Sequence, residues 1–338
     1  MTHSRSMPEI IQLASAFYGS SVLFAAIEAD VFSAIEACPS APSAKVLAER
    51  TGLDPRGLRL LLDGAVACGL LEKQADSYLN TSVAKQCLVR GAVHDLTGAI
   101  RYNHDVYGAW GKLTQLVQSG EPVEAPQVHL GDDRERTRNF ALAMHGRAMG
   151  IGQAVVPMLK FPRAGRVLDL AGGPGTYAVL IAQANPHMTC ETRDLPAISQ
   201  VAQELVQRSS VADRVICKPG DYHTDTYEPN SVEAVTIFGA LHQESPEQIV
   251  EILARAHGAL VPGGVIYILD MMTDDTHTYP AFSALFAINM ALTTHNGWVF
   301  SDKELQGWLE KVGFAQCQTR AVPPPMPHWL VTATKPTT

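Results

Sequence analysis

Apolar residues near the N-terminus recur every three or four positions, which is the spacing of an amphipathic helix. Residues 8–37 keep this spacing through Ile10, Leu13 and Phe17 and beyond. The pattern predicts one long helix, or two helices joined near Gly19. Such a helix has more apolar surface than a small domain can easily bury, so we expect the protein to form a homodimer.

The following segment has the pattern of a winged-helix module. Residues 43–51 and 54–68 predict two short helices on either side of a turn at Gly52, and residues 70–81 predict a small hairpin. A module of this kind is often a DNA reader. Further helices are predicted within residues 92–160, interrupted by a Pro- and Gly-rich linker.

The pattern changes character near residues 150–162, where short apolar, β-rich runs begin to alternate with helical stretches. This alternation predicts parallel βαβ units in a doubly wound α/β sheet. The predicted fold is a Rossmann-like sheet with an N-terminal, mostly helical winged-helix domain. Predicted strands are RVLDLAGG, MTCETRD, RVICKPGD, VEAVTIFGAL, VIYILDMM, AQCQTRAV and HWLVTATK, and helices are predicted near 175–184, 196–208, 246–259 and 302–312. We expect domains at 1–100, 101–160 (a helical linker that lines the substrate site) and 161–338.

Charge decides between the possible roles of the winged helix. The 338 residues include 34 acidic and 26 basic side chains, a net charge of −8, and residues 1–150 hold 16 acidic against 14 basic ones. A DNA-reading helix normally needs a basic surplus for phosphate contacts. We therefore predict no nucleic-acid partner and a packing or dimerisation role, and keep a DNA-binding regulator as an alternative.

Two features point to a cytoplasmic protein. The N-terminal apolar run is interrupted by Glu9, Glu28 and Asp30, so no membrane span, membrane partner or signal peptide is expected. The six cysteines are scattered without a C-x-x-C pair, which favours reduced thiols over a disulfide frame or zinc site.

The strongest chemical signal is a glycine-rich turn at the end of an apolar strand, over residues 167–175. Glycines there allow a nucleotide to approach the backbone at the carboxyl edge of a parallel sheet. Residues 173–178 also fit the dinucleotide pattern G-x-G-x-x-A, with Asp194 placed as a ribose-binding acid. The turn alone leaves NAD and S-adenosylmethionine open.

Three further features favour S-adenosylmethionine. Asp169 precedes the turn, where its carboxylate would attract a cation and repel a pyrophosphate. Asp221 and Tyr222 close the third strand, where an acid can accept from an adenine amino group beside an aromatic ring. A helix then leads through residues 257–264 into a strongly apolar strand.

At these residues the sequence resembles a known family. Residues 163–275 resemble class I S-adenosylmethionine-dependent methyltransferases. The whole chain is similar to small-molecule O-methyltransferases of the plant caffeate type and of bacterial secondary metabolism, which carry an N-terminal winged-helix dimerisation domain. The matching stretches are 168–175, 193–196, 220–222, Leu241-His242 and 260–264, with further likeness at 109–113, 119–122, 140–144 and 328–333.

The resemblance implies transfer of a methyl group from S-adenosylmethionine to a hydroxyl of a small aromatic molecule. It assigns His242 as the general base, a task suited to imidazole near neutral pH. The implied cofactor-binding residues are Asp169, Gly172, Gly173, Gly175, Asp194, Leu195, Asp221, Tyr222 and Phe238. Alternatives are a C- or N-methyltransferase and a relative that binds the cofactor without methylating.

Departures from the family pattern concern the surroundings of the base. Ala171 replaces a glycine, Gln243 replaces the aspartate that usually follows the histidine, and residues 295–302 lack the glutamate that orients the base in plant members. His242 is therefore expected to lack its usual partner, and substrate positioning or a strand cap are its alternative roles.

The acceptor site is expected in the helical region and in residues 282–300. The predicted substrate-binding residues are His104, Met144, His145, Met290, His295 and Asn296; weaker candidates are Tyr102, Tyr107, Trp110, Phe140, Phe286, Asn289 and Trp298. Asp270, Asp274, Asp275 and His277 were considered as metal ligands. They are expected in a solvated loop without metal-ligand spacing, so no metal is predicted.

Overall fold

The computed structural model describes residues 4–124, 133–161, 164–324 and 326–337. The chain folds as two compact units, Met1–Asp105 and Val106–Thr338. Helix α7 (Thr97–Trp110) crosses the division between them. The finer division at residues 100 and 160 stays a prediction.

The first unit has the predicted order of helix, turn, helix and hairpin. Its elements are α1 (Met7–Ser15), α2 (Phe17–Glu28), α3 (Val31–Glu36), α4 (Ala44–Thr51), α5 (Pro55–Ala67), β1 (Leu71–Gln74), β2 (Ser77–Asn80) and α6 (Ser82–Cys87). The side chains of Ser43 and Asp54 accept backbone N–H bonds and so cap α4 and α5. Phe32, Leu62 and Tyr78 are buried in the common core of these elements.

The start of the N-terminal helical run is two helices, which was one of the two predicted alternatives. They join at Ala16, three residues before Gly19, and the run is interrupted again before α3. Asp30 has a φ of 51°, the left-handed conformation that ends α-helical hydrogen bonding. Aspartate tolerates this conformation better than most residues, and here it turns the chain.

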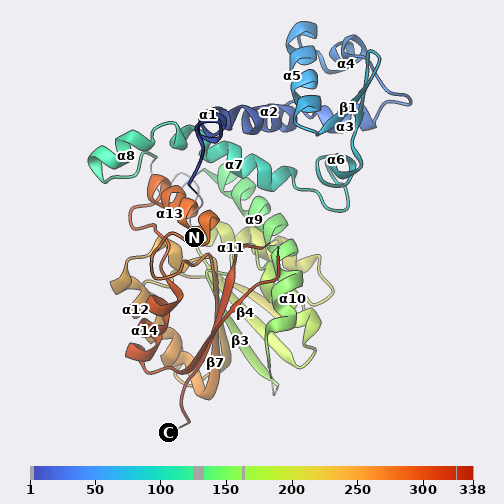
Figure 1. The fold of residues 1–338 in the computed structure, drawn as a ribbon. Coiled ribbons are helices and arrows are strands. Elements are labelled where there is room, and N and C mark those ends of the chain that lie inside the picture. The colour runs from blue at the N-terminus through green and yellow to red at the C-terminus, as the bar shows by residue number, and fades with distance from the viewer. Residues whose placement is uncertain (1–3, 125–132, 162–163, 325, 338) are drawn as a thin grey trace. The chain divides into compact units, whose positions relative to one another are not determined.

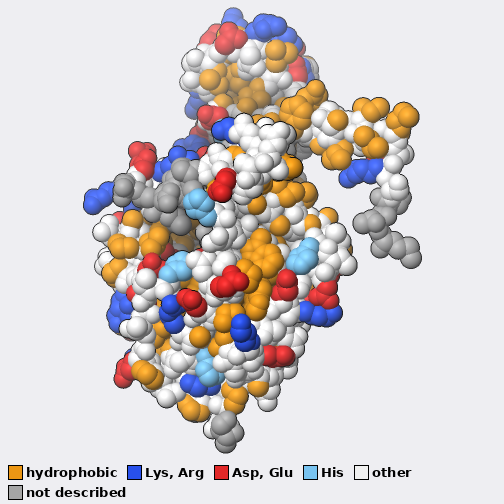
Figure 2. Space-filling model, turned by 90° about the vertical axis from the view of Figure 1, so that its left-hand side faces the viewer, with side chains coloured by type: hydrophobic (Ala, Val, Ile, Leu, Met, Phe, Trp, Pro, Cys, Tyr) orange, Lys and Arg blue, Asp and Glu red, His pale blue; other side chains and the backbone are white. Residues whose placement is uncertain are grey.

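Helix α1 exposes its apolar side chains. None of its residues is buried, and Met7, Ile10, Ile11 and Leu13 are all exposed (Figure 2). By length and composition, Met7–Glu28 would be able to cross a membrane, with a mean hydropathy of 1.7 and 11% of its most apolar window buried. One such run near an N-terminus is weak evidence for a span. An uncovered apolar helix is equally a surface for a second protein chain.

The second unit is built on a seven-stranded sheet with the order β5-β4-β3-β6-β7-β9-β8 (Figure 1). Its strands are β3 (Gly165–Leu170), β4 (Met188–Asp194), β5 (Val215–Pro219), β6 (Val232–Phe238), β7 (Leu260–Asp270), β8 (Ala315–Ala321) and β9 (Trp329–Thr334). Strands β3 to β7 pair in parallel, and β9 is antiparallel to both β7 and β8. The predicted doubly wound α/β class is confirmed.

Helices cover both faces of this sheet because neighbouring strand residues point to opposite sides. Val167 packs with α9 (Arg134–Val155), α10 (Thr176–Ala184) and α11 (Pro196–Gln207), whereas Leu168 packs with α12 (Pro246–Ala259) and α14 (Asp302–Val312). Parallel strands covered on both faces have continuous runs of apolar residues in the sequence. This explains why the strands could be predicted well from the sequence.

The strand order reverses beside β3, and this fixes where a ligand fits. From β3 the chain moves outward to β4 and β5, then returns to place β6 on the other side of β3. Ligands of open α/β sheets bind at the carboxyl ends of the strands beside such a switch point. Two further helices of this unit are α8 (Leu113–Ser119) and α13 (Ala281–Thr293). The sequence analysis placed part of the acceptor site in residues 282–300 without predicting a helix there.

Candidate functional site

A buried carboxylate stands at the end of β3. Asp169 is 1% exposed, and its Oδ1 accepts the Thr236 hydroxyl at 2.6 Å. Its Oδ2 is buried with no hydrogen-bond partner among the described residues. Burial raises the pKa of Asp169 to about 7, although the Thr236 hydrogen bond lowers it in part. A buried oxygen without a partner, beside a glycine turn, fits the ammonium group of an amino-acid ligand.

The glycine turn leaves no room for a side chain at Gly172. A Cβ there would lie 1.8 Å from Thr192 Oγ1 and 2.7 Å from Asp169 Oδ2. Gly173 and Gly175 have φ values of 56° and 72°, which a glycine adopts without strain. The turn therefore requires glycine, because Gly172 has no room for a Cβ and the backbone of Gly173 and Gly175 is left-handed.

We expect Gly172→Ala to weaken S-adenosylhomocysteine binding more than about tenfold and to lower the free energy of unfolding by about 1–3 kcal/mol, since the extra methyl overpacks the turn. Calorimetric titration and denaturant unfolding measure the two effects. Gly307→Ala in α14 is the matched control, because no atom lies within 4 Å of its Cβ. Wild-type binding by Gly172→Ala would contradict the assignment of this turn.

Two further carboxylates stand at the ends of the neighbouring strands. Asp194, the last residue of β4, accepts the N–H of Gly173 at Oδ2 and of Leu195 at Oδ1, both at 2.7 Å. Burial raises the pKa of Asp194 to about 6, although these backbone bonds lower it in part. Asp221, after β5, has a side chain that is 42% exposed. Carboxylate oxygens accept more than one hydrogen bond, so both acids can still receive a ligand donor.

These residues fit S-adenosylmethionine. Three acids on adjacent strand ends offer a partner for its ammonium group, for its ribose hydroxyls and for its adenine amine. Three further predicted cofactor residues have other contacts. The Tyr222 hydroxyl donates to Glu244 Oε1 at 2.7 Å, Phe238 is buried edge-on against Tyr177, and Leu195 is the N-cap residue of α11. The cofactor-binding roles of all nine predicted residues stay predictions.

Cofactor affinity is expected to rise with pH up to about 7.5. Because burial raises the pKa of Asp169 to about 7, much of this carboxyl is protonated at pH 6. A cationic ligand favours the ionised form, so binding releases a proton below pH 7, with at most about a tenfold gain in affinity per pH unit. Calorimetry of S-adenosylhomocysteine in buffers of different ionisation enthalpy measures this proton. Asp169→Asn should bind S-adenosylhomocysteine weakly and release no such proton. If the affinity of this variant depended on pH as that of the wild-type protein does, Asp169 would not be the titrating group.

The turn after β6 holds His242 against a second buried acid. His242 is 7% exposed, and its Nδ1 lies 2.6 Å from Oδ1 of Asp270, which is 1% exposed. Oδ1 of Asp270 also accepts the Met271 N–H, and Oδ2 accepts the His242 N–H. A carboxylate at Nδ1 selects the tautomer that carries its proton there, which leaves the lone pair of Nε2 free to accept a proton.

Asp270 corrects two expectations from the sequence. We expected it in a solvated loop, and we expected His242 to lack its usual partner. Strand β7 instead continues through Asp270 as its last residue, beside β6. The signal was present, since an acid that ends a fully apolar parallel strand lies at the ligand edge. The register between β6 and β7 decides which histidine this acid contacts, and the sequence alone does not determine that register.

Two other side chains extend this site. The Phe286 ring of α13 packs edge-on against the His242 ring at 5.1 Å. His328, which the sequence did not single out for chemistry, is buried beside the start of β9, where Trp329 pairs with Asp270. Burial lowers the pKa of His328 to about 4, so its imidazole is neutral near pH 7. An apolar ring and a neutral imidazole suit an aromatic ligand with a polar substituent.

The predicted substrate-binding residues fall into three groups. His145 Nδ1 lies 2.7 Å from the Thr176 hydroxyl at the start of α10, and Met290 is buried in α13. His295 and Asn296 are exposed; His295 lies 4.0 Å from Glu121, and Asn296 donates to Gln248. Met144 is partly buried in α9, and His104 belongs to the first unit, where it packs against Phe24. Their substrate roles stay predictions.

The other acids considered for metal binding are not grouped as metal ligands. Asp275 pairs with Lys303, and His277 lies 3.6 Å from Glu304. Asp274 caps its own turn by accepting from Thr276. Among the described residues, no group of three His, Cys, Asp or Glu side chains has the arrangement of a metal site.

Comparison with known proteins identifies the family of this chain. Residues 118–315 match the model of an O-methyltransferase domain, and residues 11–90 match that of an O-methyltransferase dimerisation domain. The chain is 34% identical to the tetracenomycin polyketide synthesis 8-O-methyl transferase of Streptomyces glaucescens, over 96% of both chains. It is 28% identical to an N,N-dimethyltransferase of Streptomyces rimosus, over 97% and 96% of the two chains. The structure of human N-acetylserotonin methyltransferase in complex with S-adenosylmethionine has the same fold, with 22% identity, a TM-score of 0.87 and full coverage of both chains.

Proposed function

Because this chain belongs to the O-methyltransferase family, whose methyl donor is S-adenosylmethionine, we propose that it methylates a hydroxyl group of a small aromatic molecule, with His242 as the general base. The observation that supports the proposal best is the buried hydrogen bond between His242 and Asp270 at the ligand edge of the sheet. The similar polyketide 8-O-methyl transferase supports an aromatic hydroxyl as acceptor.

In the proposed reaction, Asp270 holds the His242 ring and stabilises the imidazolium that forms. His242 Nε2 takes the proton of the acceptor hydroxyl while its oxygen attacks, which is the role of a general base. S-adenosylmethionine supplies a methyl group already activated for this attack. Phe286 orients the ring of the acceptor beside His242 and excludes water. Holding the reactants in line supplies much of the acceleration.

Asp169, Asp194 and Asp221 would hold the ammonium, ribose and adenine parts of the cofactor, respectively, and the glycines 172, 173 and 175 would admit its amino-acid part. Calorimetric titration with S-adenosylhomocysteine, NAD and duplex DNA tests this assignment. We expect micromolar-range binding of S-adenosylhomocysteine alone. Binding of NAD without S-adenosylhomocysteine would favour the dinucleotide interpretation of the glycine turn, and binding of DNA without it would favour a DNA-binding regulator. Either result would overturn the proposal.

An N-methyltransferase is the second candidate, supported by the N,N-dimethyltransferase among the similar proteins. It needs no general base when the acceptor amine is neutral, because the nitrogen lone pair attacks directly. The buried pairing of His242 with Asp270 is more useful for a hydroxyl acceptor, which must lose a proton.

We propose that the protein acts as a homodimer through its first unit, supported by the dimerisation-domain match and the exposed apolar face of α1. The double variant Ile11→Glu/Phe17→Glu is expected to raise the dimer dissociation constant at least about tenfold, because charged groups are costly in an apolar interface. Sedimentation velocity measures the change. Val93→Glu, at an apolar site that is 89% exposed, is the matched control. A wild-type protein that sediments as a monomer would contradict the proposal.

A further inference from the structure

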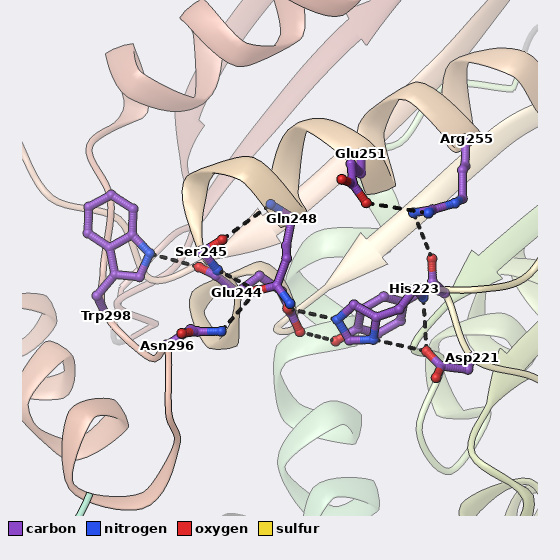
Figure 3. Close-up of polar contacts among 10 residues, drawn as sticks. Asp221, His223, Glu244, Ser245, Gln248, Glu251, Arg255, Asn296 and Trp298 are labelled. Carbon is purple, nitrogen blue, oxygen red and sulfur yellow. Dashed lines mark hydrogen bonds and ion pairs between the residues drawn. The ribbon is translucent and has the colours of Figure 1, made fainter. Parts of the chain in front are cut away.

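One histidine links the two halves of the proposed site. His223 lies between two carboxylates, with Nδ1 2.9 Å from Asp221 Oδ1 and Nε2 2.8 Å from Glu244 Oε2 (Figure 3). A neutral imidazole carries only one N–H, so between two ionised carboxylates both contacts are hydrogen bonds only in the doubly protonated form. The arrangement therefore describes an imidazolium that joins two acids.

Glu244 needs this cation because it is buried. Its side chain is 7% exposed, and its two oxygens are taken by the Tyr222 hydroxyl and by His223. A further cation near the cluster, Arg255 of α12, pairs with Glu251 (Figure 3). Arg255 also donates to the Tyr222 carbonyl. Burial lowers the pKa of His223, but the bonds to Glu244 and Asp221 outweigh it and raise the pKa above its ordinary value. A buried carboxylate that loses its cation is strongly destabilised.

Glu244 also fixes the turn that carries His242. Its N–H donates to the Leu241 carbonyl, and its carbonyl accepts the Trp298 indole N–H at 2.9 Å. The backbone N–H of Trp298 in turn donates to the His242 carbonyl at 3.0 Å. A displacement of Glu244 would therefore move the turn of the base and the segment next to it.

We propose that His223 is a positioning residue that couples the adenine end of the cofactor site to the turn of the base, through Asp221 on one side and Glu244 on the other. Nδ1 of the ring, together with the His223 backbone N–H, holds Asp221 Oδ1, so that Oδ2 is left for the adenine amine. The other holds Glu244, Trp298 and hence His242 in place. The inference rests on the proposed function for the roles of Asp221 and His242.

Two variants separate the halves of this link. His223→Asn places an amide near the position of Nδ1 and keeps the contact with Asp221, whereas His223→Gln places one near Nε2 and keeps the contact with Glu244. We expect His223→Gln to weaken S-adenosylhomocysteine binding about tenfold at pH 7, the effect of losing one charge-assisted hydrogen bond. His223→Asn should bind S-adenosylhomocysteine within about threefold of wild type, because it keeps the hydrogen bond to Asp221.

The contact between His223 and Glu244 is tested by hydrogen exchange of the Trp298 indole N–H, which nuclear magnetic resonance measures. We expect at least about tenfold faster exchange in His223→Asn, since local opening becomes easier once Glu244 loses its partner. His223→Gln should exchange like wild type. S-adenosylhomocysteine should slow this exchange in the wild-type protein and in neither variant. Trp298→Phe assigns the signal, and His187→Gln, at the opposite ends of the strands, is the matched control.

Equal effects of both variants on binding and exchange, in step with a lower melting temperature, would show a merely structural role and overturn the proposal. A wild-type His223 ring with one protonated nitrogen at pH 7, seen in nitrogen-15 spectra, would also overturn it. The nitrogen-15 measurement needs no cofactor. Failure of the wild-type protein to bind S-adenosylhomocysteine would instead refute the proposed function.

Discussion

Replacing His242 by glutamine is expected to lower kcat by about 10²- to 10⁴-fold, the usual contribution of a positioned general base. The measurement is methyl transfer to a phenolic acceptor that the wild-type protein methylates. Glutamine has no basic nitrogen, so the hydroxyl must then lose its proton to water. The affinity for S-adenosylhomocysteine should change little, because the cofactor acids lie on the ends of β3, β4 and β5 rather than on this turn.

The loss should be smaller at high pH, where more of the acceptor is ionised before it binds. His187→Gln controls for the loss of an imidazole at the opposite ends of the strands, where His187 Nε2 lies 3.1 Å from the Phe161 carbonyl oxygen. Full turnover by His242→Gln would refute the base assignment and favour a positioning or capping role for His242.

Asp270→Asn is expected to lower kcat by about 10- to 10³-fold, within the range of a lost general base and its orienting acid. All three groups that contact the carboxylate are donors: His242 Nδ1, the His242 N–H and the Met271 N–H. In either orientation an asparagine directs its own NH₂ group at one of them. The amide also removes the charge that stabilises the imidazolium formed in the reaction.

Asp275→Asn is the matched control for Asp270→Asn, because Asp275 follows β7 but is exposed and pairs with Lys303. The Asp270 variant should keep its affinity for S-adenosylhomocysteine while kcat falls. An equal loss of turnover in both variants, or no loss in Asp270→Asn, would contradict the proposal that Asp270 orients His242 and stabilises its imidazolium.

The sequence located the sheet well because its strands are buried on both faces. Residues such as Leu168, Val235 and Ile268 lie in continuous apolar runs that end in glycine or acid, and the glycine turn follows β3 as predicted. The placement of Asp169, Asp194 and Asp221 at one edge follows from parallel pairing alone. The match to the dimerisation domain likewise agrees with the dimer predicted from the apolar N-terminus.

The features that could not be predicted from the sequence are contacts between distant segments. The pairing of β7 with β6 brings Asp270 to His242. The contact of His223 with Glu244 joins two loop residues that are 21 positions apart. The same limit explains the exposed positions of His295 and Asn296, which lie in the loop after α13, where no periodic pattern indicates which side chains face the pocket. Local conformation was misjudged at Asp30, where the turn uses a residue other than glycine.

Transfer of a carbon-13 methyl group from labelled S-adenosylmethionine to a panel of polyphenolic aromatic compounds, read by magnetic resonance of the products, tests the central claim most directly. The account predicts a label bonded to an aromatic hydroxyl oxygen, formed by the wild-type protein and reduced at least about 10²-fold in His242→Ala. A label on carbon or nitrogen, or O-methylation that persists undiminished in His242→Ala, would contradict it.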